Sequence, residues 1–152
     1  MAALNESDLR LFVDSVTRYF QVTSRTPPQI AAAYLGTDSL PMHDLNGIVS
    51  FSGRFSGQVT VSLPAMAVRE LLLMQRETDL SESNLLDAVG EIANTLAGNA
   101  RQTLGNGLEI SVPVTMRGRG GRPPRVRQHP YVITFRRHTH PGTVCVDLDR
   151  VA

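Results

Sequence analysis

The segment from residue 82 to residue 104, which the sequence GNG follows, constrains the fold more than any other part of the chain. Apolar residues recur along it every three or four positions, at Val89, Ile92, Ala93, Leu96, Ala100 and Leu104. This spacing places them on one face of a helix. Asp79 with Glu82, or Ser81 a little later, can cap the start of such a helix, and the glycines can end it. The sequence therefore predicts a helix over about 82–104, buried along one side.

The opposite face of this helix carries residues that a purely structural helix would not select. At 100° per residue, Asp87, Glu91, Asn94, Gly98 and Arg101 fall within an arc of about 80°. Asp87 and Glu91 are like charges four residues apart, which costs about 0.2–0.5 kcal/mol. Two glycines lie inside the helix, Gly90 and Gly98, and each costs roughly 1 kcal/mol relative to alanine. Gly98 also removes bulk one turn beyond Asn94, so another molecule could approach closely. This face is either a solvated helix surface or the contact surface for a partner.

The remaining pattern predicts helices and strands in separate runs. We expect a helix over 5–22 with Asn5 or Ser7 as its cap, strands within 29–36 and 46–63, a helix over 64–77 that begins at Pro64, and strands over 108–118, 131–139 and 142–151. The order of helix, strands, two helices and strands predicts an α+β fold. In it, amphipathic helices pack on a mostly antiparallel sheet. We expect residues 1–152 to form a single domain.

Composition excludes several classes of protein. Hydrophobic residues make up 41% of the chain and charged residues 19%, as in globular domains. The longest apolar run, 71–74, is too short to span a bilayer. The first ten residues do not have the basic and apolar regions of a secretory signal. With Cys145 as the single cysteine, no intrachain disulfide can form. These features predict a cytoplasmic location and no membrane contact.

The polar face of the 82–104 helix belongs to a longer motif. Its members are Asp87, Glu91, Asn94, Gly98, Asn99 and a downstream strand that carries Pro113. This motif resembles the signature of the CheC/CheX/FliY phosphatases of bacterial chemotaxis. The segment 87–118 is similar to the CheX branch in particular, and the preceding strands and helix fit that branch's order. One copy of the motif is present, whereas CheC-type members have two. The resemblance therefore favours CheX and implies a homodimer.

The resemblance implies a phosphatase that hydrolyses the aspartyl phosphate of a CheY-type response regulator. In such an enzyme Asn94 would hold the attacking water, as a glutamine does in GTPases. Glu91 would pair with the regulator's lysine beside the phosphorylated aspartate. Asp87, Gly98 and Arg101 would contact the partner. The resemblance places Mg²⁺ on the regulator and no cofactor on this chain. The alternative is a binding module that docks a response regulator or a flagellar switch component without catalysis.

Three other features have simpler interpretations. The arginine-rich run 117–127 could be a solvated hairpin loop, a dock for an acidic regulator surface or a nucleic-acid contact. We do not expect nucleic acid as the partner, because no aromatic residue is interleaved for base stacking. His138 and His140 lie two apart in a predicted strand, without a nearby carboxylate or thiolate, and we expect surface histidines rather than a metal site. We expect Cys145 to be a buried structural thiol.

Overall fold

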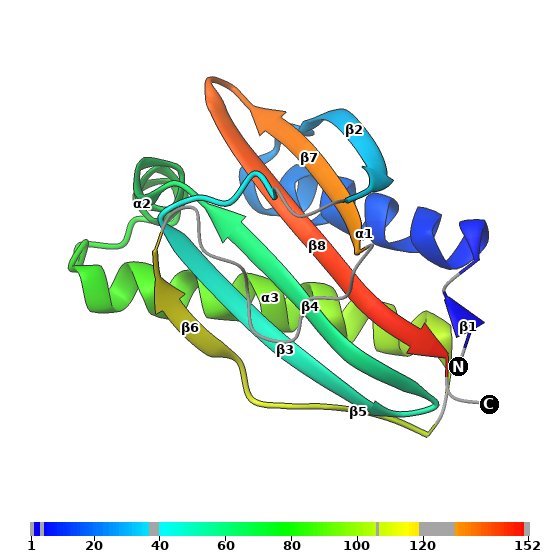
Figure 1. The fold of residues 1–152 in the computed structure, drawn as a ribbon. Coiled ribbons are helices and arrows are strands. Elements are labelled where there is room, and N and C mark those ends of the chain that lie inside the picture. The colour runs from blue at the N-terminus through cyan, green and yellow to red at the C-terminus, as the bar shows by residue number, and fades with distance from the viewer. Residues whose placement is uncertain (1, 4, 37–39, 106, 119–129, 151–152) are drawn as a thin grey trace.

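A computed structural model describes residues 2–3, 5–36, 40–105, 107–118 and 130–150, and it confirms the predicted α+β class. Every strand pairing in its single sheet is antiparallel. The strand order is β2 (Gln29–Leu35), β7 (Tyr131–Arg137), β8 (His140–Arg150), β4 (Phe55–Leu63), β3 (Leu45–Gly53) and β5 (Leu108–Ile110), with β1 (Ala2–Ala3) beside β8 and β6 (Val114–Arg117) beside β3. All three helices lie on one side of this sheet (Figure 1).

The helices are α1 (Glu6–Ser24), α2 (Ala65–Met74) and α3 (Glu82–Leu104). Asn5 caps α1, as one of the two expected candidates, and its side chain accepts a hydrogen bond of 2.8 Å from the amide of Asp8. The Asp8 carboxylate accepts in return from the Asn5 amide, which completes a capping box. The long helix α3 crosses the sheet behind β3 and β4 and packs against both other helices (Figure 1).

The hydrophobic core lies between the helices and the face of the sheet that they cover. Alternate strand residues such as Val49, Val59 and Ile133 point into it, and α3 contributes Val89 and Leu96. Each of these side chains is at most 1% exposed. Full burial of one such side chain stabilises the fold by about 1.5–3 kcal/mol. Because buried residues recur along the length of α3, the core fixes which face of that helix points outward.

The strand predicted over 108–118 is wrong as a single element. It is divided into β5 and β6, which both pair with β3 and are separated by residues 111–113. Within this break Ser111 still bonds to β3, because its amide donates to the Ser50 carbonyl and its hydroxyl accepts from the Ser50 amide, each at 2.9 Å. Pro113 has no amide hydrogen to continue the ladder. The break therefore turns the chain at the point where it passes α3.

Other differences lie at the ends of elements. Helix α2 ends at Met74 rather than near residue 77, and Arg76 just after it has a positive φ of 62°. His138 lies in the turn between β7 and β8 with φ 54°, not within a strand. The pairing of β1 with the end of β8 was not predicted. Most of the arginine-rich run, residues 119–127, lies outside the described residues. Its first member, Arg117, forms a 2.7 Å ion pair with Glu82.

Candidate functional site

The site is built on α3, whose limits agree with the sequence prediction. The Ser81 hydroxyl caps the helix by accepting a 3.3 Å hydrogen bond from the Asn84 amide. The Asp79 carboxylate accepts one from the Ser81 amide, and this bond lowers the pKa of Asp79. Gly105 ends the helix, and its amide still donates to the Arg101 carbonyl. Local signals at both ends thus fix the register of the residues between them.

The outward face of α3 presents the five predicted residues together, and we call them the polar row: Asp87, Glu91, Asn94, Gly98 and Arg101. The four side chains of the row are exposed, and Gly98 is half-buried. Within the described part of the chain, none of these four side chains forms a hydrogen bond or an ion pair. The row therefore carries two acids, an amide and a cation whose bonding capacity is directed at solvent.

Gly98 and Gly90 are interior glycines of the same helix with opposite surroundings. A Cβ atom at Gly98 would meet no atom within 4 Å, so the predicted open space there is confirmed. A Cβ at Gly90 would lie 2.8 Å from Cγ2 of Thr115 and 3.6 Å from Cβ of Pro113. Gly90 therefore allows the broken strand segment to pack directly on α3, next to Glu91. Periodicity along the helix could not reveal this, because the contact joins segments distant in sequence.

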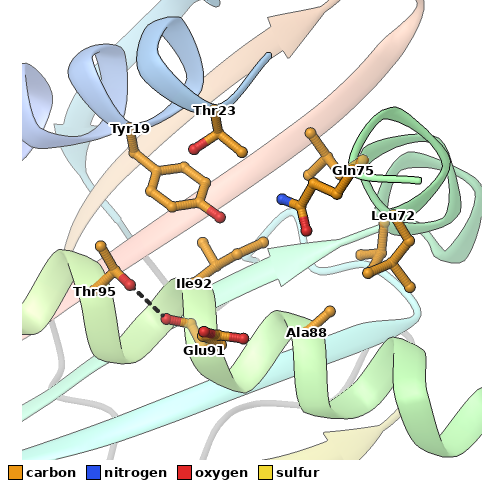
Figure 2. A pocket seen from close by; sticks show the side chains of 10 residues that line it. Tyr19, Thr23, Leu72, Gln75, Ala88, Glu91, Ile92 and Thr95 are labelled. Carbon is orange, nitrogen blue, oxygen red and sulfur yellow. Dashed lines mark hydrogen bonds between the residues drawn. The ribbon is translucent and has the colours of Figure 1, made fainter. Parts of the chain in front are cut away.

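A groove opens beside Glu91, between α3 and the other two helices (Figure 2). Its volume is about 190 Å³. Its apolar floor includes Leu72 and Ile92, and its edge includes Tyr19 of α1, Gln75 after α2, and Glu91. Burial raises the pKa of Tyr19, a hydrogen bond with Thr23 lowers it, and the negative charge of Glu91 raises it further. Sequence reasoning missed Tyr19 and Gln75, since nothing local shows that three helices meet there.

A second and wider hollow, of about 580 Å³, continues along the same flank of α3. Thr95 lines both hollows, and the second also contains Gly98 and Arg101. The acid Glu91 and the cation Arg101 thus stand beside successive hollows. They are ten residues apart, or about 15 Å along the helix. A partner that docks along α3 would meet opposite charges at its two ends.

The expectation that no carboxylate lies near the two histidines is wrong. Glu70 of α2 contacts His138 Nδ1 at 3.1 Å and His140 Nε2 at 2.7 Å. It also accepts a 3.3 Å bond from Arg137, which is only 4% exposed. Although burial raises the pKa of Glu70, the His138 hydrogen bond and the charges of Arg137 and His140 lower it more, so the net shift is downward. We call Glu70, Arg137, His138 and His140 the paired cluster.

The described residues contain no group of three or more His, Cys, Asp or Glu side chains arranged to hold a metal ion. Cys145 is buried as expected, and burial raises the pKa of its thiol to about 12. Among the described residues, no helix is both long enough and apolar enough to cross a membrane.

The fold places the chain in a class of known structures. A chemotaxis protein CheX from Desulfovibrio desulfuricans has 22% sequence identity and a TM-score of 0.79, over 95% of this chain and 99% of that one. A chemotactic CheC-like protein from Shewanella oneidensis has 19% identity and a TM-score of 0.82, over 96% and 100%. CheX in a complex with CheY, BeF₃ and Mg²⁺ from Borrelia burgdorferi has 15% identity and a TM-score of 0.73, over 93% and 97%.

The family itself follows from the sequence. The model of the family described as chemotaxis phosphatase CheX matches residues 45–136, which is more than half of the chain. The protein belongs to this family, and the resemblance found from the polar row is confirmed. No curated protein sequence matches the chain. The matched region includes α2, α3 and the break before β6, and therefore the whole polar row.

Proposed function

We propose that this protein hydrolyses the aspartyl phosphate of a CheY-type response regulator, with the polar row inserted at the phosphorylation site. The observation that carries the proposal is the row itself: exposed polar side chains without partners among the described residues, on a helix whose other face is buried in the core. Membership in the CheX family and the CheX–CheY complex among the similar structures support the choice of partner.

The chemistry requires little covalent assistance from this chain. Water attacks phosphorus, the bond between phosphorus and the aspartate oxygen breaks, and inorganic phosphate and a free carboxylate leave. Such phosphoryl transfers depend mainly on positioning and electrostatic stabilisation. Asn94 suits the positioning of water, because its carboxamide can both donate and accept hydrogen bonds and carries no charge to repel the phosphoryl oxygens. Its neighbours Ala93 and Leu96 are buried, so the backbone that carries it is held in place.

Glu91 has a different role in this proposal. As an anion it would be repelled by the phosphoryl group, but it can pair with the lysine of the regulator beside the phosphorylated aspartate. The Mg²⁺ needed by the reaction belongs to the regulator. Asp87 and Arg101 contact the partner's surface on either side, and Gly98 gives the clearance for its close approach. We also propose that the protein acts as a cytoplasmic homodimer.

A dephosphorylation time course tests the proposal. Candidate phosphorylated receiver domains are followed with and without the protein, and we expect faster loss of phosphate. Asn94→Ala should reduce the acceleration about 100-fold or more, the usual cost of losing one preorganised polar group at a transition state. Gln21→Ala is the matched control, since Gln21 is an exposed carboxamide on α1. Full activity of Asn94→Ala would show that the water-positioning role is wrong.

The alternative is a binding module that docks the regulator without hydrolysing its phosphate. The same polar row favours it, because unpartnered charges serve recognition as well as catalysis. Binding to the phosphorylated regulator without any change in its phosphate lifetime would select this alternative. The role of the arginine-rich run stays a prediction, and a gel shift with single-stranded RNA or DNA tests it.

A further inference from the structure

The groove beside Glu91 brings together three oxygen-bearing side chains from three helical segments. Tyr19 comes from α1, Gln75 follows α2, and Glu91 belongs to α3. Their polar ends point toward the same space (Figure 2). The Tyr19 hydroxyl oxygen has two lone pairs, so it can accept a hydrogen bond from a ligand in the groove. The groove thus offers a carboxylate, an amide and a phenol as acceptors for one ligand group.

The chemistry of the groove restricts what can occupy it. Among the residues that line it, Glu91 is the only charged one, so a cation is favoured and an acid excluded. The floor of Leu71, Leu72 and Ile92 is apolar and suits an aliphatic stem. Lysine combines such a stem with an ammonium group that has three donors and no acceptor, which matches the three acceptors. Arginine would present five donors in a rigid planar fork, whereas the three donors of an ammonium group can turn toward acceptors from three different segments.

The size of the groove agrees with a single side chain. Its volume of about 190 Å³ is close to that of a protein cavity of about 150 Å³ that binds one benzene molecule. That space is too small for a helix or strand of a partner. It is therefore a subsite within a larger docking surface, at the edge of the polar row.

We propose that this groove receives the response regulator's lysine that pairs with Glu91, and that Tyr19 and Gln75 are positioning residues that hold its ammonium group. The inference rests on the proposed function and adds to it the subsite that binds this lysine, which we call the seat. The groove holds the lysine at Glu91 while Asn94, one helical turn further along, faces the phosphoryl group. Recognition of the regulator and placement of water are then divided between two sides of one helix.

Steady-state kinetics with the phosphorylated regulator test the seat. Tyr19→Phe and Gln75→Leu each remove one hydrogen-bond acceptor and keep a side chain of similar shape. Each should raise KM about tenfold, the usual effect of losing a hydrogen bond to a charged group, while kcat at saturation is retained. Tyr34→Phe is the matched control, because Tyr34 lies on β2 outside the groove and is 39% exposed. Thermal melts of all variants check that each folds.

A binding cycle, in which Tyr19 and the regulator's lysine are substituted singly and together, tests whether that lysine occupies the groove. The regulator is loaded with beryllofluoride and Mg²⁺, and its dissociation constant is measured with the wild-type protein and with Tyr19→Phe. Both measurements are repeated with a regulator whose lysine is replaced by methionine. Tyr19→Phe should weaken binding of the lysine form about tenfold and leave binding of the methionine form unchanged.

Three results would overturn the inference: unchanged KM in both groove variants, a fall in kcat at constant KM, or an equal loss of affinity for the lysine and methionine regulators. Failure of the proposed function is distinct, since then the wild-type protein itself does not shorten the phosphate lifetime. In that case the binding cycle still decides whether the groove holds the lysine. If the wild-type protein binds no loaded regulator, the seat is rejected too.

Discussion

The polar row and the paired cluster both carry charged side chains, but they differ in whether those charges have partners within the molecule. In the paired cluster, Glu70 satisfies Arg137 and both histidines within the molecule. In the polar row, Asp87, Glu91 and Arg101 form no ion pair with any described residue. Charges paired internally connect α2 to the β7–β8 turn, whereas the unpaired ones are available to a partner. The comparison distinguishes charges that hold the fold together from charges that a partner could bind.

The largest expected effect on stability is at the centre of the paired cluster. Arg137 donates to Glu70, to the Ser24 hydroxyl at 2.9 Å and to the Met74 sulfur at 2.9 Å. Arg137→Met should lower the free energy of unfolding by about 3 kcal/mol, because it removes the three hydrogen bonds that this buried cation donates. The melting temperature should fall by about 10 °C.

The neighbouring residue gives the control. Arg136 on the same strand is exposed, so Arg136→Met should change stability by less than about 0.5 kcal/mol. Dephosphorylation per folded molecule should be unchanged in both variants. A loss of activity in Arg137→Met without a loss of stability would contradict the structural assignment of the cluster.

The next effect tests how the row is supported. In Gly90→Ala the new methyl group would lie 2.8 Å from Cγ2 of Thr115, so the Thr115 side chain or one of the two segments must shift. Overpacking of this kind costs about 1–3 kcal/mol, which exceeds the gain in helix propensity. Chemical denaturation of Gly90→Ala and the wild-type protein measures this difference in the free energy of unfolding. If Gly90→Ala is as stable as the wild-type protein, the direct packing of the broken strand on α3 is not needed.

How much of this could be predicted depended on how far apart the interacting residues lie in the sequence. The limits of α3 and its polar row were predicted, because the Ser81 cap, the apolar period and the final glycines all act within one segment. The paired cluster was missed, since Glu70 and Arg137 are 67 residues apart and only the tertiary fold joins them. The same holds for Tyr19 beside Glu91, and for Gly90 against Pro113. Local patterns thus located the exposed polar face of α3 but not the contacts around it.

Gly98→Ala should have a smaller effect on stability, and one of opposite sign. Its methyl group would meet open space, so the variant should gain about 0.5–1 kcal/mol from helix propensity and reduced chain entropy. Activity tests the clearance separately. If the partner approaches closely at this point, the more stable variant should bind the regulator more weakly, with a raised KM. Unchanged KM would show that the space above Gly98 is not used.

The smallest expected effect is the pH dependence of the paired cluster. The pKa of Glu70 is lower in the folded protein than the 4.5 of an unperturbed carboxyl. The folded state therefore binds the proton less readily, and Glu70 contributes stability above about pH 4.5 that is lost as the pH falls through its folded pKa. The contribution is small because 31% of the side chain is exposed and water screens the pair. Melting curves of the wild-type protein and Glu70→Gln between about pH 7 and pH 3 should converge at the acid end, since protonation removes the charge that the substitution removes. A constant difference across this range would mean that Glu70 stabilises the fold through its shape and hydrogen bonds rather than through its charge.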